Sequence, residues 1–222
     1  MICIESNYDF KFSTIYSQLL NPHHKNMKRR NTVGLYGGSF NPIHIGHIGL
    51  ARQILSLNLV DEVWFSVSPQ NPLKQNAFLL DDEKRLSIVR HALEGEPRMI
   101  ATDYEFHLPK PSYTWNTLHS LQADYPDTEF VLIIGADNWA CIDRWSHGLE
   151  IAHHYPIIVY PRKGDTIDSS TLPPNVTLLN TPMIDVSSTE IRSLIANGHP
   201  ITGLVPASIE KEIEERYGKQ PL

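Results

Sequence analysis

The sequence predicts an α/β fold, with a doubly wound parallel sheet of the Rossmann-like type and a small helical part at the C-terminus. From residue 32 onward, short apolar runs typical of strands alternate with segments of helical periodicity. The most apolar run, at residues 130–134, has five apolar residues in succession, which is typical of a strand buried on both faces. This alternation implies right-handed crossovers that place helices on both faces of one sheet.

The elements are expected in a regular order along the chain. Strands are predicted at 32–36, 61–68, 98–106 and 129–137, in the second half of 149–162, and at 176–182. Helices are predicted at 46–59, 81–95 and 112–126, at the start of 149–162, and at 187–198 and 206–218. The second helix is expected to have Asp81 or Asp82 as its N-cap.

Residues 1–31 differ from the rest, and we expect them to be an appendage to a single α/β domain at 32–222. They show little periodicity, contain a Pro-His-His break and end near a basic cluster at 28–30. Met27 stands directly ahead of that cluster, so a misassigned start upstream of Met27 is one interpretation.

Composition disfavours several classes of protein. The chain has 222 residues, of which 41% are apolar and 20% charged, as in ordinary globular domains. Its 19 Lys and Arg against 25 Asp and Glu give a net charge of −6, so a broad surface for nucleic acid is not expected. No apolar run approaches the ~18 residues of a membrane span, and Cys3 and Cys141 show no metal-ligand spacing. We therefore expect a cytoplasmic protein that binds neither nucleic acid nor membranes.

In an open parallel sheet, ligands bind beyond the carboxyl ends of the strands, so the loops there are the candidate sites. The loop after the first strand, at 34–47, packs small and polar residues where a phosphate group would lie. Its glycines have the spacing G-x-x-G-G, which is neither the dinucleotide fingerprint nor a loop ending in Gly-Lys-Ser/Thr. A dehydrogenase and a nucleotide hydrolase of that type are both disfavoured.

His44 and His47 lie three residues apart where this loop enters a helix. Their side chains are expected to share one face, beside the free N–H groups and the positive end of the helix dipole. Such an arrangement suits a polyphosphate, although taken alone two surface or capping histidines would look the same. A zinc site is disfavoured because no credible third ligand lies close by.

Two further segments present polar residues. The Pro-rich loop at 66–75 presents Asn71 and Lys74, or is simply a rigid surface loop. In the segment Pro-Ser-Tyr-Thr, Ser112 or Thr114 can cap the following helix.

The most apolar strand ends in Gly135 and Asp137, and Trp145 follows eight residues after Asp137. Glycine at a strand end lets a ligand approach, a carboxylate can accept from ribose hydroxyls, and an indole offers a flat face to an aromatic ring. A tryptophan alone is more often part of the core.

The pattern at 186–195 predicts the start of a helix with an N-cap. Ser187, Ser188 or Thr189 is expected to be the cap, and Arg192 to point near the same end.

Two of these segments resemble the nucleotidyltransferase superfamily. The loop at 37–47 has the sequence Gly-Gly-Ser-Phe-Asn-Pro-Ile-His-Ile-Gly-His. It is similar to the superfamily's G-x-F-x-P-x-H-x-G-H loop, which binds the triphosphate of ATP or CTP. Val-Ser-Ser-Thr-Glu-Ile-Arg, at 186–192, is similar to the I-S-S-T-x-I-R motif that closes over the ATP phosphates in adenylyltransferases. His-Ile-Gly-His also occurs in class I aminoacyl-tRNA synthetases, but the length and net charge of this chain disfavour a synthetase.

With the Pro-Ser-Tyr-Thr segment and the Gly-Ala-Asp to Trp145 segment added, residues 32–218 resemble the bacterial nicotinate-nucleotide adenylyltransferases. The chain departs from their pattern at a few places. Asn41 stands where Asp is usual, Val186 replaces Ile, and Ser146 stands where an aromatic residue is common. The Pro-rich loop lacks the common Pro-Pro-His-Lys form.

The resemblance implies transfer of AMP from ATP to nicotinate mononucleotide, with Mg²⁺ bound along with ATP and no metal site of the chain's own. It implies the catalytic residues His44, His47 and Arg192. It also implies an ATP site made of Gly37, Gly38, Ser39, Phe40, His44, His47, Gly135, Asp137, Ser187, Ser188, Thr189 and Arg192, and an acceptor site made of Asn71, Lys74, Thr114 and Trp145. The alternatives are pantetheine-phosphate adenylyltransferase, a cytidylyltransferase, or a non-catalytic nucleotide-binding module. A homo-oligomer is left open.

Overall fold

The computed structural model describes residues 30–69, 79–162, 167–180, 182 and 184–218. Over these residues the chain forms one parallel sheet of six strands in the order β3-β2-β1-β4-β5-β6. The strands are β1 (Asn31–Gly38), β2 (Glu62–Val67), β3 (Met99–Thr102), β4 (Thr128–Gly135), β5 (Ile157–Tyr160) and β6 (Val176–Leu178). The expectations for residues 1–29 and for Asn71 and Lys74 fall outside the described residues.

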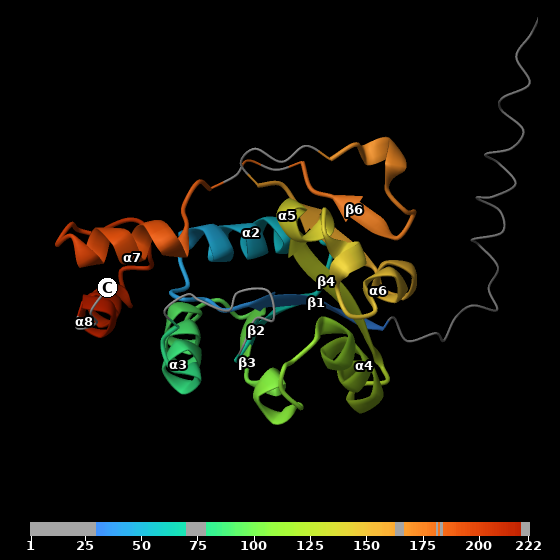
Figure 1. The fold of residues 1–222 in the computed structure, drawn as a ribbon, viewed down its shortest axis with the longest axis horizontal. Coiled ribbons are helices and arrows are strands. Elements are labelled where there is room, and N and C mark those ends of the chain that lie inside the picture. The colour runs from blue at the N-terminus through green and yellow to red at the C-terminus, as the bar shows by residue number, and fades with distance from the viewer. Residues whose placement is uncertain (1–29, 70–78, 163–166, 181, 183, 219–222) are drawn as a thin grey trace, which may run out of the picture. The chain divides into compact units, whose positions relative to one another are not determined.

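Helices connect these strands and cover the sheet (Figure 1). The α-helices are α2 (Ile45–Ser56), α3 (Asp82–Ala92), α4 (Thr114–Asp124), α5 (Ala136–Trp139), α6 (Gly148–His154), α7 (Ser188–Ala196) and α8 (Glu210–Gly218). Short 3₁₀ turns are η2 (Tyr104–His107), η3 (Ile142–Arg144) and η4 (Ser169–Thr171). Among the described helices, none is both long and apolar enough to cross a membrane.

The predicted doubly wound architecture is confirmed, because two separate cores form on the two faces of the sheet. Figure 1 shows α2 and α3 on one side of the strands and α4 and α6 on the other. Successive residues of β4 alternate between the cores: Ile133 packs with α2, α3, α7 and α8, whereas Leu132 and Ile134 pack with α4 and α6. The last six residues of β4 are all buried, as expected of a central strand covered on both faces.

The third strand is shorter than expected. We predicted a strand over 98–106, but β3 ends at Thr102 and Tyr104–His107 forms the turn η2. The Thr102 Oγ1 atom accepts a hydrogen bond from the Tyr104 backbone N–H at 3.1 Å. This side-chain bond replaces a ladder bond and turns the chain inward, so that Glu105 becomes buried.

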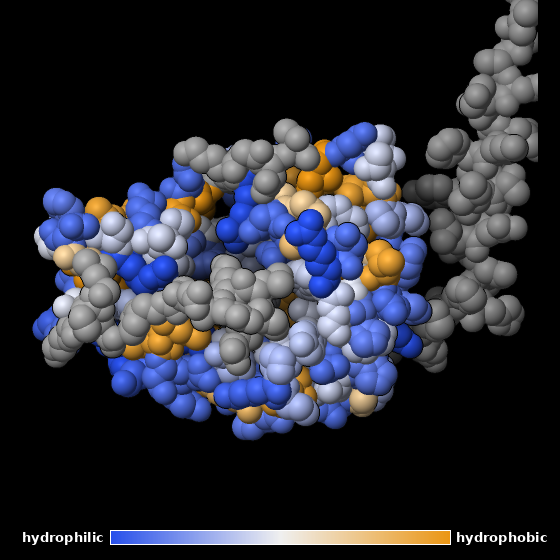
Figure 2. Space-filling model, in the orientation of Figure 1, coloured by the Kyte–Doolittle hydropathy of each residue, from blue (hydrophilic) through white to orange (hydrophobic). Residues whose placement is uncertain are grey.

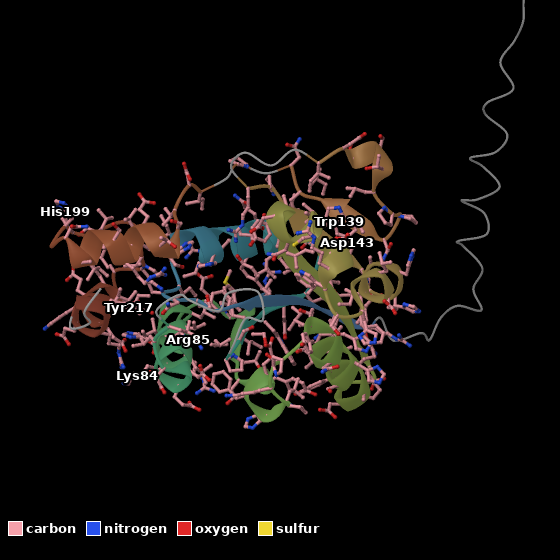
Figure 3. All side chains as sticks on the ribbon, viewed as in Figure 1. Lys84, Arg85, Trp139, Asp143, His199 and Tyr217 are labelled. Atoms are coloured by element: carbon pink, nitrogen blue, oxygen red, sulfur yellow. The ribbon has the colours of Figure 1, made fainter. Side chains whose placement is uncertain are left out.

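Buried polar contacts tie helices α8 and α3 to the loop after β1. The Asn41 Oδ1 atom accepts from the Tyr217 hydroxyl of α8 at 2.8 Å and from the Leu80 backbone N–H at 3.2 Å. The fully buried Arg85 of α3 donates to the backbone oxygens of Leu80 at 2.8 Å and Ser39 at 2.5 Å. Figure 3 labels Arg85 and Tyr217 on these neighbouring helices. The side chain at position 41 must therefore offer an oxygen that accepts two hydrogen bonds. The amide oxygen of Asn41 does this, as a carboxylate oxygen of Asp would.

We expect Tyr217→Phe to lower the free energy of unfolding by about 1 kcal/mol, because the buried Asn41 oxygen loses one of its donors. Urea denaturation measures this change. The matched control is Tyr125→Phe, at an exposed tyrosine, which should change the unfolding free energy by less than about 0.5 kcal/mol. Equal effects of the two substitutions would show that the buried hydroxyl contributes nothing.

Candidate active site

A pocket opens at the carboxyl ends of the strands, where β1 and β4 lie side by side. Five of the residues predicted from sequence line it: Gly37, Gly38, Thr114, Gly135 and Trp145. Figure 2 shows that this face of the molecule is largely hydrophilic, with scattered apolar patches. Because the strand order reverses between β1 and β4, the chain leaves these two strands toward opposite faces and leaves a crevice between them.

The two glycines at the end of β1 have different roles. A Cβ added to Gly38 would lie 3.0 to 3.2 Å from ring atoms of Phe40, so this glycine makes room for the buried Phe40 ring. A Cβ added to Gly37 would meet no atom within 4 Å. Gly37 therefore faces open space in the pocket, where a ligand could approach the backbone.

His44 and His47 lie together at the N-terminus of α2, as predicted. His44 is the N-cap residue, and the two imidazole rings stack with their centroids 3.7 Å apart. The His44 backbone N–H donates to the His47 Nδ1 atom at 3.2 Å. A neutral imidazole that accepts at Nδ1 carries its proton on Nε2, so His47 is a donor at Nε2.

His44 is held in its neutral form. Its side chain is only 6% exposed, and among the described residues its Nδ1 atom has no hydrogen-bond partner. Burial, together with the positive charge of Arg162, lowers the pKa of His44 from 6.5 to about 4. A Cβ added to Gly46 would lie 3.0 Å from the His44 ring, so the glycine at this position allows the ring to lie over the helix start.

Two residues that sequence reasoning missed, Tyr160 at the end of β5 and Arg162 just after it, form a network with Asp137 of α5 near these histidines. The Arg162 Nη2 atom donates to the Tyr160 hydroxyl at 3.1 Å, and its Nε atom lies 3.3 Å from Asp137 Oδ1. Burial raises the pKa of Tyr36, and the neighbouring Tyr160 raises it further. The signal in the sequence was a Tyr and an Arg at the end of a buried strand, at the edge of the sheet where ligands bind. Asp137 is thus paired with Arg162 in this structure.

Helix α7 brings the second predicted anion-binding segment against the loop after β1. Ser187 is the N-cap, and its hydroxyl accepts from the Glu190 N–H at 3.1 Å. The Ser188 hydroxyl donates to the backbone oxygen of Pro42 at 2.8 Å.

The Arg192 guanidinium makes the second link between α7 and this loop. It donates to the backbone oxygen of Asn41 at 2.6 Å and to Thr189 Oγ1 at 3.2 Å. Segments about 150 residues apart in sequence therefore meet at the loop after β1, although His44, His47 and Arg192 are not among the residues that line the pocket.

The start of α4 and Trp145 line one part of the pocket. The expected cap by Ser112 or Thr114 is wrong, because Tyr113 is the N-cap residue and makes no side-chain capping bond. The Ser112 hydroxyl instead donates to the buried carboxylate of Glu105. The indole Nε1 of Trp145 is buried and, in the described part of the chain, has no partner.

Glu105 was not predicted as a site residue, although it lines the pocket. Burial raises its pKa, and hydrogen bonds from the hydroxyls of Ser66, Ser112 and Ser68 oppose that shift. No group of three or more His, Cys, Asp or Glu side chains within the described ranges is arranged to hold a metal ion.

We expect the imidazole of His44 to titrate with a midpoint of about 4 in NMR spectra of the free protein. Arg162→Met removes the neighbouring cation and should raise this midpoint. It should stay below 6.5, because burial is the larger cause and remains. A midpoint of 6.5 in the unsubstituted protein would contradict the buried, neutral state of His44.

Comparison with known proteins agrees with this arrangement. Residues 35–194 match the cytidylyltransferase-like family. The fold is similar to that of a Plasmodium falciparum nicotinic acid mononucleotide adenylyltransferase solved in complex with NaAD. That match has a TM-score of 0.73 at 22% identity and covers 86% of this chain and 98% of that one.

Bacterial relatives are closer in sequence. A Bacteroides fragilis protein named "Probable nicotinate-nucleotide adenylyltransferase" is 47% identical over 184 residues, which cover 83% of this chain and 92% of the relative. A Cytophaga hutchinsonii protein of the same name is 41% identical, over 83% of this chain and 96% of the relative. At this identity and coverage, the chain belongs to the nicotinate-nucleotide adenylyltransferases, within the cytidylyltransferase-like family.

Proposed function

We propose that this chain transfers AMP from ATP to nicotinate mononucleotide, giving nicotinate adenine dinucleotide and pyrophosphate. The observation that supports the proposal is the contact between the two segments expected to bind phosphate, at 37–47 and 187–192. The stacked His44 and His47 stand at the start of α2, and α7 is joined to the preceding loop by Arg192. The family membership of the chain supports the same activity.

In the proposed reaction, a 5′-phosphate oxygen of nicotinate mononucleotide attacks the α-phosphorus of ATP. A new P–O bond forms as the bond to the bridging oxygen breaks, and pyrophosphate leaves with the electron pair. The chain has no covalent step to perform, so it acts by positioning the reactants and stabilising charge.

The triphosphate would lie over the N-terminus of α2. There the His47 Nε2–H, the neutral His44 and the first N–H groups of the helix would donate to its oxygens. Gly37 and Gly38, with Ser39 and Phe40, would let the nucleotide approach the backbone of the loop. Gly135 and Asp137 would hold its adenosine part.

Arg192 would hold the far end of the triphosphate together with the helix start at Ser187, Ser188 and Thr189. Arg192 now donates to the Asn41 backbone oxygen and would exchange that contact for a phosphate oxygen. Because the guanidinium is already held beside the loop, little side-chain freedom would be lost on binding.

Thr114 and Trp145 would hold the pyridine side of the acceptor, since both line the pocket. Asn71 and Lys74 remain candidates for contacts with the mononucleotide phosphate. We propose that Mg²⁺ enters with ATP as part of the substrate, since the described residues offer no cluster of carboxylates to hold it.

The activity is tested by incubating the protein with Mg²⁺, ATP or CTP, and one acceptor at a time, and by measuring pyrophosphate release. Nicotinate mononucleotide with ATP should be the best pair. Preference for phosphopantetheine or glycerol phosphate would identify another nucleotidyltransferase. Nucleotide binding without pyrophosphate release from any pair would identify a non-catalytic module.

We expect His47→Ala to lower kcat by roughly 10² to 10³-fold, the usual effect of losing one donor to a developing charge. The melting temperature should change little, because the ring lies at the edge of the core. His199→Ala is the control, since His199 is exposed and Figure 3 places it beyond α7, away from the pocket. A folded His47→Ala variant with the pyrophosphate release of the control would remove His47 from the mechanism.

We expect kcat/KM to be higher for nicotinate than for nicotinamide mononucleotide. A carboxylate only accepts hydrogen bonds, whereas an amide also donates, and the uncapped start of α4 offers N–H groups and the Thr114 hydroxyl. An amide NH₂ group that faces these donors should cost roughly 1 to 3 kcal/mol, which gives a preference for the carboxylate of about ten to a hundredfold.

Measurement of kcat/KM for both acceptors, in the unsubstituted protein and in Trp145→Ala, checks this preference. Stacking on an indole does not distinguish the two rings, so Trp145→Ala should weaken both acceptors and keep their ratio. Equal kcat/KM values for the two acceptors in the unsubstituted protein would contradict acid specificity.

A further inference from the structure

Glu105 is a buried carboxylate for which the proposed reaction has no use. It is 7% exposed, belongs to the turn η2 and lines the pocket at the acceptor end. A buried ionisable group is costly to keep unless its environment satisfies it, so its partners indicate its role.

Hydroxyls from different parts of the chain bind Glu105: Ser66 and Ser68 from β2 and the residue after it, and Ser112 from the segment before α4. The Ser66 hydroxyl, on β2, donates to Oε1 at 2.9 Å, and the Ser112 hydroxyl donates to Oε2 at 2.9 Å. Ser66 is fully buried in a strand that pairs on both sides, with β1 and β3, so it is a fixed point of the sheet. The carboxylate therefore links the rigid end of β2 to the loop that leads into α4.

Within the described residues, the start of α4 has no side-chain cap. Ser112 precedes the N-cap residue Tyr113, which makes no side-chain capping bond, and Thr114 is the first residue of the helix. The first N–H groups of α4 are thus not satisfied by a cap, and they lie next to Thr114, which lines the pocket. A shift of Ser112 would move these donors together.

We propose that Glu105 is a positioning residue for the acceptor, which fixes Ser112 against β2 and so places Thr114 and the open N-terminus of α4 in the pocket. This inference rests on the proposed function, because it assigns the acceptor to that end of the pocket. Glu105 acts through Ser112 and does not contact the reacting phosphates.

A carboxylate suits this role better than an amide, because both of its oxygens accept. In Glu105→Gln, an NH₂ group replaces one acceptor oxygen, and a hydroxyl that donated to that oxygen must turn to accept from it. The side chain keeps its shape, so the core around it is retained while the link to Ser112 or to Ser66 is altered.

The test measures KM and kcat for both substrates in Glu105→Gln and in Ser112→Ala, with the melting temperature of each variant. Each substitution should raise the KM for nicotinate mononucleotide by about tenfold, the effect of one lost hydrogen bond. The KM for ATP should stay unchanged, and kcat should fall by less than about threefold. Glu62→Gln is the matched control, because Glu62 lies at the other end of β2 and accepts a bond from Trp64 at 3.1 Å, away from the pocket lining.

The double variant Glu105→Gln/Ser112→Ala should raise the KM for the acceptor no further than the stronger single variant, because both act through one contact. If the double variant instead raises the KM for the acceptor by the product of the two single effects, the proposal is overturned. It would equally be overturned if Glu105→Gln lowered only the melting temperature, or raised the KM values for ATP and the acceptor alike. If Glu105→Gln does not fold, Ser112→Ala alone decides between an acceptor-specific effect and none.

Failure of the proposed function is a separate result. The unsubstituted protein would then release no pyrophosphate from ATP and nicotinate mononucleotide, whatever the variants do. If it is active and the variants match the Glu62→Gln control in every constant, the proposed function holds and the role of Glu105 is wrong.

Discussion

The reversal of strand order between β1 and β4 is the constraint on which the site depends. The chain adds β2 and β3 on one side of β1 and then returns to add β4, β5 and β6 on the other. The segments that leave β1 and β4 must therefore pass to opposite faces, and a crevice opens between them at the carboxyl ends. Helix α2 packs into the core on one face of the sheet, and Trp145 packs against the core on the other face and lines the pocket. No local feature of either loop could create this space, because it follows from the order of the strands.

Buried polar contacts then hold the loops around the crevice in place. Asn41 joins the loop after β1 to α8, and Arg85 joins the same loop to α3. Glu105 joins β2 to the segment before α4. Each contact pairs groups from distant segments inside a weakly polar interior, where an unpaired partner is costly, so each favours one arrangement of its loop over others. The donors of the site are thereby positioned before a ligand arrives, which is what electrostatic stabilisation of a transition state requires.

The sequence predicted the sheet and its two-sided helical cover, because these follow from hydrophobic periodicity. The meeting of the segments at 37–47 and 186–192 was expected from their resemblance to the nucleotidyltransferase motifs. The sequence did not predict the pairing of Asp137 with Arg162 or of Ser112 with Glu105. Both pairs depend on which elements become neighbours in space and on how a short loop turns, and periodicity carries neither piece of information. The expected cap at Ser112 failed for this reason: its hydroxyl had a second, non-local partner that a local rule does not consider.

The charge state of the site suits the release of a highly charged product. Burial and the positive charge of Arg162 lower the pKa of His44 to about 4, and the His47 Nδ1 atom accepts from the His44 backbone N–H. Neutral donors bind a triphosphate only moderately, but they gain strength as negative charge grows on the departing pyrophosphate. Two cations near the site are engaged in the free protein, Arg162 with Asp137 and Arg192 with the Asn41 backbone oxygen. Where a phosphate oxygen replaces one of these protein partners, the lost contact offsets part of the attraction and limits how tightly pyrophosphate is retained.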